Sequence, residues 1–159
     1  PYTTLFRSSG DTVMLATYGS SKTKATLKKA KAGGVTYRIV GVGANAFNTK
    51  RGKLVKSIAF KSDYPVTYLG KNAFRNTTSL TSLEINLGIN TSYQNGRYKV
   101  SAWDGTTFAK TAFSGAGKDG GRGLTVYYHS YGQDFASAYK GFLTRKGLSP
   151  NARVAYRES

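Results

Sequence analysis

The 159-residue sequence predicts a repeat solenoid made of β-strands with short helices, and two observations support that prediction. First, the phrase Gly-x-Asn-Ala-Phe occurs twice, at residues 43–47 and 70–74, with a spacing of 27 residues. Second, a strand-like apolar run follows each copy, at residues 55–60 and 80–85. Self-similarity at a spacing of roughly 20–50 residues is typical of stacked repeats. Such proteins present an extended binding surface rather than a catalytic pocket.

The chain begins with two segments that differ from the repeats. Residues 1–8 resemble the translation of a sequencing adapter, and no Met precedes them. We therefore expect a non-native tail without conserved structure, and we expect the natural amino terminus and its signal peptide to be missing. Residues 9–38 contain three strand-like runs, 12–18, 24–28 and 35–40, separated by turns. We expect these runs to form a small β-sheet that caps one end of the array.

Residues 39–130 are expected to form the repeat coils. Gly43 and Gly70 would permit a backbone bend that a side chain would strain, and Phe47 and Phe74 would stack on one another in the core. Because a single coil cannot bury its own apolar face, we expect the strands of successive coils to pair in parallel and to cover each other. The two strand-like runs align as Val55, Ile58 and Phe60 with Leu80, Leu83 and Ile85.

A third, degenerate copy of the phrase lies at 108–113, where Thr111 replaces the Asn. Leu124 and Val126 then align with Leu83 and Ile85, both at an offset of 41 residues. The predicted repeat core consists of Phe47, Ile58, Phe60, Phe74, Leu83, Ile85, Phe113, Leu124 and Val126.

An insertion at about 87–105 explains the greater length of this coil. Asn95-Gly96 is a strong two-residue hairpin signal, and pairing about it matches Tyr93 with Tyr98. Because insertions in one repeat often carry binding, and aromatic and Arg side chains are favoured contacts, this segment supplies the candidate ligand-binding residues. They are Tyr93, Arg97, Tyr98, Lys99 and Trp103. The alternative is that the three aromatic side chains fold back onto the coils.

The last segment, residues 131–159, is expected to cap the second end of the array. Apolar side chains at helical spacing predict a helix over 133–146, and Gly147 and Pro150 would end it. Residues 153–156 would add a last short strand.

These features together resemble a known family. The Gly-x-Asn-Ala-Phe phrase, the apolar spacing after it and the closing stretch from Leu124 to Leu148 are similar to the BspA-like leucine-rich repeats of bacterial surface proteins. The resemblance covers about residues 12–156. It implies a right-handed, leucine-rich-repeat-like solenoid of about three coils, display or secretion outside the cell, and a role in adhesion or protein binding. It implies no shared catalytic residues and no cofactor.

The residues themselves give little support to an enzyme. His129 is the only histidine, and the seven acidic residues are scattered along the chain. No nucleophile-elbow sequence accompanies the histidine, and the glycine-rich segment 115–123 lacks the Gly-Lys-Ser/Thr ending of a phosphate loop. The absence of cysteine excludes disulfides and thiolate metal sites. We therefore expect no catalytic, cofactor or metal residues.

The charge of the chain keeps a second functional class open. Twenty-four Lys and Arg face seven Asp and Glu, which gives a net charge of +17. Such a surface attracts anions in general, including wall polymers, acidic glycans and nucleic acid, although no nucleic-acid motif is present. The first hypothesis is an extracellular module that binds a protein or glycan, and the alternative is an anion-binding module.

Overall fold

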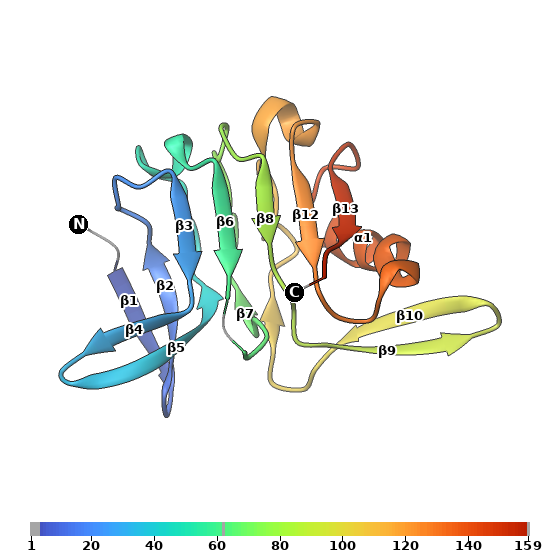
Figure 1. Ribbon diagram of the computed structural model, residues 1–159, viewed down its shortest axis with the longest axis horizontal. Helices are drawn as coiled ribbons and strands as arrows, with labels where there is room; N and C mark the ends of the chain where they lie inside the picture. The colour runs from blue at the N-terminus through green and yellow to red at the C-terminus, as the bar shows by residue number, and fades with distance from the viewer. Residues whose placement is uncertain (1–3, 62, 159) are drawn as a thin grey trace.

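The computed structural model describes residues 4–61 and 63–158, and two β-sheets enclose its apolar core (Figure 1). The first sheet has the strand order β1-β2-β5-β7-β11, with β4 beside β5. Its strands are β1 (Thr4–Ser9), β2 (Thr12–Thr17), β4 (Lys29–Ala32), β5 (Val35–Val42), β7 (Tyr68–Leu69) and β11 (Thr107–Phe108). From β2 to β11 its neighbouring strands along this path are parallel.

The second sheet has the strand order β13-β12-β8-β6-β3, and all of its neighbouring strands are parallel. Its strands are β3 (Lys24–Leu27), β6 (Ser57–Phe60), β8 (Ser82–Glu84), β12 (Thr125–Tyr128) and β13 (Arg153–Tyr156). The short helices are η1 (Gly52–Leu54), η2 (Lys118–Gly121), η3 (Gln133–Phe135) and α1 (Ala136–Thr144). None of the helices within residues 4–61 and 63–158 has the length and apolar character needed to cross a membrane.

A row of aromatic rings runs through the core. The rings of Phe47 and Phe74 stack with their centroids 5.6 Å apart, and Phe74 stacks on Phe113 at 5.3 Å. Tyr18 extends the row at the other end, 5.0 Å from Phe47. The predicted stacking of Phe47 on Phe74 is therefore confirmed. All nine residues named above as the repeat core are buried.

In the repeated phrase, the asparagine rather than the glycine has the backbone conformation that bends the chain. Asn45 and Asn72, with φ of 56° and 55°, adopt the left-handed conformation that turns the chain, and Asn tolerates this conformation better than most side chains. Gly70 is needed for another reason, because a Cβ there would lie 2.4 Å from the backbone nitrogen of Ala44. The Asn makes the bend, and the glycine lets successive copies of the phrase approach each other.

The amino-terminal segment does not form a separate small sheet. Within residues 9–38, β2 and β5 belong to the first sheet, whereas β3 forms the edge of the second. Ala25 and Leu27 pair in register with Ile58 and Phe60, so their buried side chains continue the core. Residues 4–8 of the expected tail belong to strand β1 (Thr4–Ser9), which pairs with β2.

The register of the third coil also differs from the prediction. Val126 pairs with Leu83, and Tyr127 pairs with Glu84, so the offset is 43 residues instead of 41. Tyr128, rather than Val126, is therefore the residue of the third coil that corresponds to Ile85. A shift of two residues keeps every side chain on its original face of the sheet, and for that reason Leu124 and Val126 are still buried.

The insertion forms the hairpin that the sequence predicts. Strands β9 (Ile89–Gln94) and β10 (Arg97–Ala102) pair with Tyr93 opposite Tyr98 and Ile89 opposite Ala102. The hairpin projects away from the two sheets (Figure 1). The predicted helix is confirmed but shorter, with α1 ending at Thr144, and it buries Tyr139, Phe142 and Leu143.

Candidate functional site

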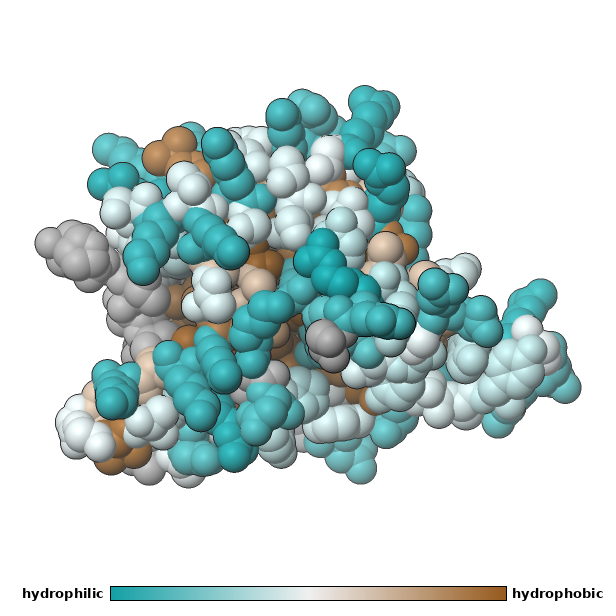
Figure 2. Space-filling model, viewed as in Figure 1, coloured by the Kyte–Doolittle hydropathy of each residue, from teal (hydrophilic) through white to brown (hydrophobic). Residues whose placement is uncertain are grey.

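The outer face of the second sheet presents a regular array of mostly polar side chains. Strand geometry places every second residue outward. The outward residues are Lys24 and Thr26 on β3, Ser57 and Ala59 on β6, Ser82 and Glu84 on β8, Thr125 and Tyr127 on β12, and Arg153 and Ala155 on β13. The residue two positions after each pair lies on the same face, and these residues are Lys28, Lys61, Asn86, His129 and Arg157. We call all fifteen residues the sheet face. Figure 2, viewed from the same side, shows hydrophilic side chains over much of it.

Hydroxyl groups line the middle of the sheet face, and positive charges surround them. Ser57, Ser82 and Thr125 form one row across three neighbouring strands. The positive charges come from five side chains, namely Lys24, Lys28, Lys61, Arg153 and Arg157. All five are exposed, and the only carboxylate among the sheet-face residues is Glu84. This arrangement favours an anionic ligand that can also accept hydrogen bonds from hydroxyl groups.

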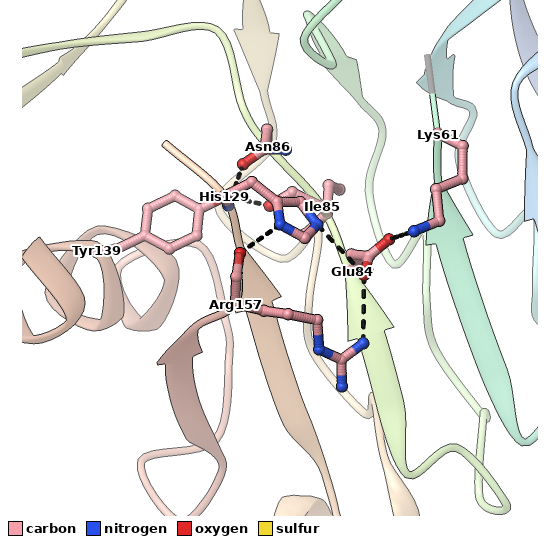
Figure 3. Close-up of polar contacts among 7 residues, drawn as sticks. All are labelled: Lys61, Glu84, Ile85, Asn86, His129, Tyr139 and Arg157. Atoms are coloured by element: carbon pink, nitrogen blue, oxygen red, sulfur yellow. Dashed lines mark hydrogen bonds and ion pairs between the residues drawn. The ribbon is translucent and has the colours of Figure 1, made fainter. Parts of the chain in front are cut away.

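Glu84 is buried beneath three basic side chains (Figure 3). Its carboxylate contacts the Lys61 ammonium, and its Oε1 lies 3.2 Å from both Arg157 Nη1 and His129 Nε2. The Arg157 guanidinium also lies over the Tyr127 ring, 3.5 Å from its centroid. One carboxylate thus holds together Lys61, His129 and Arg157. We call these three residues and Glu84 the Glu84 cluster.

The protonation of Glu84 reflects this environment. Burial raises the pKa of its carboxyl, but the hydrogen bonds and charges of Lys61, His129 and Arg157 outweigh that effect. The pKa of Glu84 is therefore lowered, and the side chain stays ionised near neutral pH. Because this carboxylate contacts the Lys61 and Arg157 cations and the His129 ring, it adds little negative charge to the surface.

His129 is fully engaged by its neighbours. Its backbone nitrogen donates to Asn86 Oδ1 at 2.9 Å, its Nδ1 contacts the Arg157 carbonyl oxygen, and its Nε2 contacts Glu84. No Ser, Thr or Asp side chain is arranged with it as in a nucleophilic triad among the hydrogen bonds of residues 4–61 and 63–158. The described part of the chain likewise contains no group of three metal-binding side chains.

The five candidate ligand-binding residues of the insertion are not brought together. Tyr93 is 65% exposed, and Arg97 and Lys99 are exposed near it on the hairpin. Tyr98 is half-buried, because its ring packs against Tyr93 on one side and Phe135 on the other. Trp103 lies beyond the hairpin, where its backbone nitrogen donates to the Gly88 carbonyl oxygen. The insertion therefore offers a hairpin end and a separate tryptophan.

The Glu84 cluster was not found from the sequence, although a signal for it exists. Lys61, Asn86, His129 and Arg157 occupy the same register position on four neighbouring strands, three residues after Ile58, Leu83, Val126 and Val154. With the correct offset for the third coil, these four side chains would have been aligned beside Glu84. The two-residue error in that offset separated His129 from the others.

Comparison with known proteins gives one similar structure. No protein-family model and no curated protein matches this chain. Among solved structures, it is similar to a leucine rich cell surface protein from Faecalibacterium prausnitzii A2-165, with 16% sequence identity and a TM-score of 0.48. The similarity covers 96% of this chain and 40% of that protein, so the chain spans less than half of the length of its neighbour.

Proposed function

We propose that this chain is a non-catalytic interaction module of a secreted or surface-displayed bacterial protein. In this proposal the chain is a short right-handed solenoid, with parallel strands added coil by coil. The chain alternates between two sheets, whose neighbouring strands are parallel from β2 to β11 in the first and throughout the second. This alternation supports the solenoid, and the row of stacked rings supports the regular repeat. The ligand binds across the sheet face rather than inside a catalytic pocket.

The positive charge of the sheet face is the single observation that indicates which class of ligand binds there. Lys24, Lys28 and Arg153 make no ion pair within the described residues, so their charges are available to a ligand. Lys61 and Arg157 are held in place by Glu84. A polyanion running across the strands would meet cations at both edges of the sheet and hydroxyl donors between them. We therefore propose an acidic polymer, such as a wall polymer or acidic glycan, as the partner.

The test is the salt dependence of polyanion binding. Heparin, lipoteichoic acid and single-stranded DNA are titrated with the chain at several NaCl concentrations. Binding should weaken steeply with salt, because cations that pair with a polyanion release its condensed counterions. A variant with Lys24→Glu, Lys28→Glu and Arg153→Glu should bind more weakly, and for DNA its log-affinity against log-salt slope should be shallower by about 2.

A matched control has the same net charge but an intact sheet face. Lys50→Glu, Lys71→Glu and Lys110→Glu change three exposed residues outside the second sheet, and both triple variants lower the net charge from +17 to +11. The control should keep most of its affinity. Equal losses in the two variants would mean that net charge alone drives binding. Affinity that does not change with salt, or no binding to any of the three polymers, would exclude the acidic-polymer proposal.

The proposed location has a separate test. The complete gene should encode an export signal, since a protein outside the cell must be secreted. Detection of the full-length protein in the cytoplasmic fraction alone would contradict this part of the proposal.

A further inference from the structure

A hollow, which we call the aromatic cleft, lies beyond the carboxyl ends of β6 and β8, away from the middle of the sheet face. Its volume is about 180 Å³, and aromatic side chains line much of it, among them Tyr64, Trp103 and Tyr131. Asp63, Asn86 and Ser130 supply polar groups to the same hollow. It suits one six-membered ring better than a drug-sized molecule.

Trp103 is held in the wall of this cleft by its surroundings. Its backbone nitrogen donates to the Gly88 carbonyl oxygen at 3.0 Å, and the Thr106 hydroxyl donates to the Trp103 carbonyl oxygen at 2.7 Å. The indole ring lies against Gly88, where an added Cβ would approach Trp103 Cε3 to 3.0 Å. Within the described residues, the indole N–H has no hydrogen-bond acceptor. The ring is thus ordered, while its donor remains available.

Tyr131 forms another wall and has an unusual backbone. Its φ of 70° is uncommon for a bulky side chain, and such strained conformations gather at ligand-binding positions. The Tyr131 hydroxyl donates to the Ile89 carbonyl oxygen at 3.0 Å, and its ring lies 5.0 Å from Phe135. These contacts fix the ring, although 48% of the residue is still exposed.

The polar groups of the cleft can be assigned from their partners. Because the backbone N–H of His129 can only donate, the Asn86 atom that it contacts at 2.9 Å must be the amide oxygen. The Asn86 amide nitrogen therefore points the other way, as Figure 3 shows, and no acceptor for it lies among residues 4–61 and 63–158. The Asp63 side chain is 79% exposed and lies 3.8 Å from Arg38 Nε. The cleft thus offers two unused donors and one carboxylate acceptor.

We propose that this cleft binds one sugar ring of a neutral glycan. Aromatic faces pack well against the C–H faces of a pyranose ring. The Asn86 amide, the Trp103 indole and the Asp63 carboxylate can bond its hydroxyl groups. Among the described residues of the lining, Asp63 alone is charged, and Arg38 lies beside it, so the lining itself carries no positive charge that would select an anion. This site shares Asn86 with the sheet face, but its lining includes none of the five cations proposed to bind the acidic polymer.

The single tryptophan of the chain makes this proposal directly testable. Tryptophan emission is recorded while the full chain is titrated with cellohexaose, xylohexaose, laminarihexaose, mannohexaose, maltohexaose and chitohexaose. At least one of these neutral sugars should give a saturable change. Raising NaCl from 50 to 500 mM should change that affinity by less than about twofold, because the ligand carries no charge. Heparin binding should fall over the same range.

Variants locate the site. Tyr131→Ala should weaken sugar binding by at least about tenfold, as expected for an aromatic side chain that the bound ring would cover. Asp63→Asn, which changes an exposed side chain and should leave folding intact, should also weaken it. Tyr93→Ala removes an exposed tyrosine of the hairpin outside the cleft and should leave the affinity unchanged.

Two outcomes would overturn the proposal. They are the absence of a saturable change with all six sugars, and an equal loss of affinity in Tyr93→Ala and Tyr131→Ala. Each of them leaves the salt-dependent binding of heparin as a separate result, so the two sites fail or succeed independently.

Discussion

Phe74 is the residue whose truncation should cost the most stability. Its ring is fully buried, stacks between Phe47 and Phe113, and meets the edge of Phe60 at 6.4 Å. Phe74→Ala should lower the free energy of unfolding by about 3–5 kcal/mol, because it removes a large side chain from a packed core. Chemical denaturation measures this loss. A melting temperature within a degree of wild type would refute the assignment of the repeat core.

A matched control for that substitution is Tyr93→Ala. It also removes an aromatic ring, but from a residue that is 65% exposed. Its unfolding free energy should stay within about 0.5 kcal/mol of wild type, as is usual for surface positions. A large loss in both variants would mean that ring removal destabilises the chain for a reason other than core packing.

Single residues were predicted well where a repeated phrase marks them. The stacking of Phe47 on Phe74 follows from their equivalent places in two copies of the phrase. The roles of Asn72 and Gly70 were not separable from sequence, because either residue type can make a bend. Only the three-dimensional approach of Gly70 to Ala44 distinguishes them.

At the scale of elements, the Glu84 cluster joins β6, β8, β12 and the segment after β13. The pKa of Glu84 is lowered in the folded chain, so the folded state favours the ionised carboxylate more strongly than the unfolded state does. That contribution to stability is present above the unfolded pKa, near 4.5, and is lost as pH falls through the folded value. Glu84→Gln should therefore be less stable than wild type at pH 7, and the difference should shrink below about pH 4.5.

Denaturant unfolding at pH 3, 4, 5 and 7 measures this difference. The exposed carboxylate of Asp104 provides the control, since Asp104→Asn should follow the wild-type pH dependence. A Glu84→Gln variant whose deficit is constant from pH 7 to pH 3 would contradict the role assigned to the carboxylate charge.

Elements were predicted best where pairing is local. The β9–β10 hairpin has the register that the Asn95-Gly96 turn dictates, because two residues between the strands leave little freedom. The pairing of β12 with β8 spans the insertion, and its register depends on how much of the chain is inserted. The apolar pair 124/126 fits an offset of 41 as well as the observed 43, since both keep the same residues inward.

The amino-terminal segment likewise could not be recognised as a repeat coil from its sequence. Tyr18 stacks on Phe47 as a repeat phenylalanine would, and Ala25 and Leu27 pair in register with Ile58 and Phe60. The Gly-x-Asn-Ala-Phe phrase is nevertheless absent from this segment. A coil without the phrase looks like an unrelated set of strands until its partners are known.

At the scale of the whole molecule, composition predicted attraction to anions but not the surface that provides it. The cations of the sheet face come from strands spread between residues 24 and 157. Their meeting depends on the parallel register of five strands, which a list of basic residues does not contain. The separate aromatic cleft likewise joins Tyr64, Trp103 and Tyr131 from three distant connections.

The net charge of +17 also has a consequence for stability. In about 0.01 M salt the screening length is roughly 30 Å, so most basic residues repel one another across the molecule; at 0.15 M it is about 8 Å. The Glu84 contacts act at 3.2 Å and are partly buried, so salt weakens them less. The melting temperature should therefore rise between 10 and 300 mM NaCl, by about 2–4 °C for each kcal/mol of repulsion removed.

Calorimetry of the Lys50→Glu, Lys71→Glu, Lys110→Glu variant separates this repulsion from other effects of salt. With a net charge of +11, it should melt higher than wild type at 10 mM NaCl and respond less to added salt. The two melting curves should approach each other at 300 mM NaCl, where long-range repulsion is screened in both proteins. If the wild-type chain instead melts lower at high salt, short ion pairs such as those of Glu84 outweigh the repulsion. The basic surface would then be a smaller cost to the fold than its charge suggests.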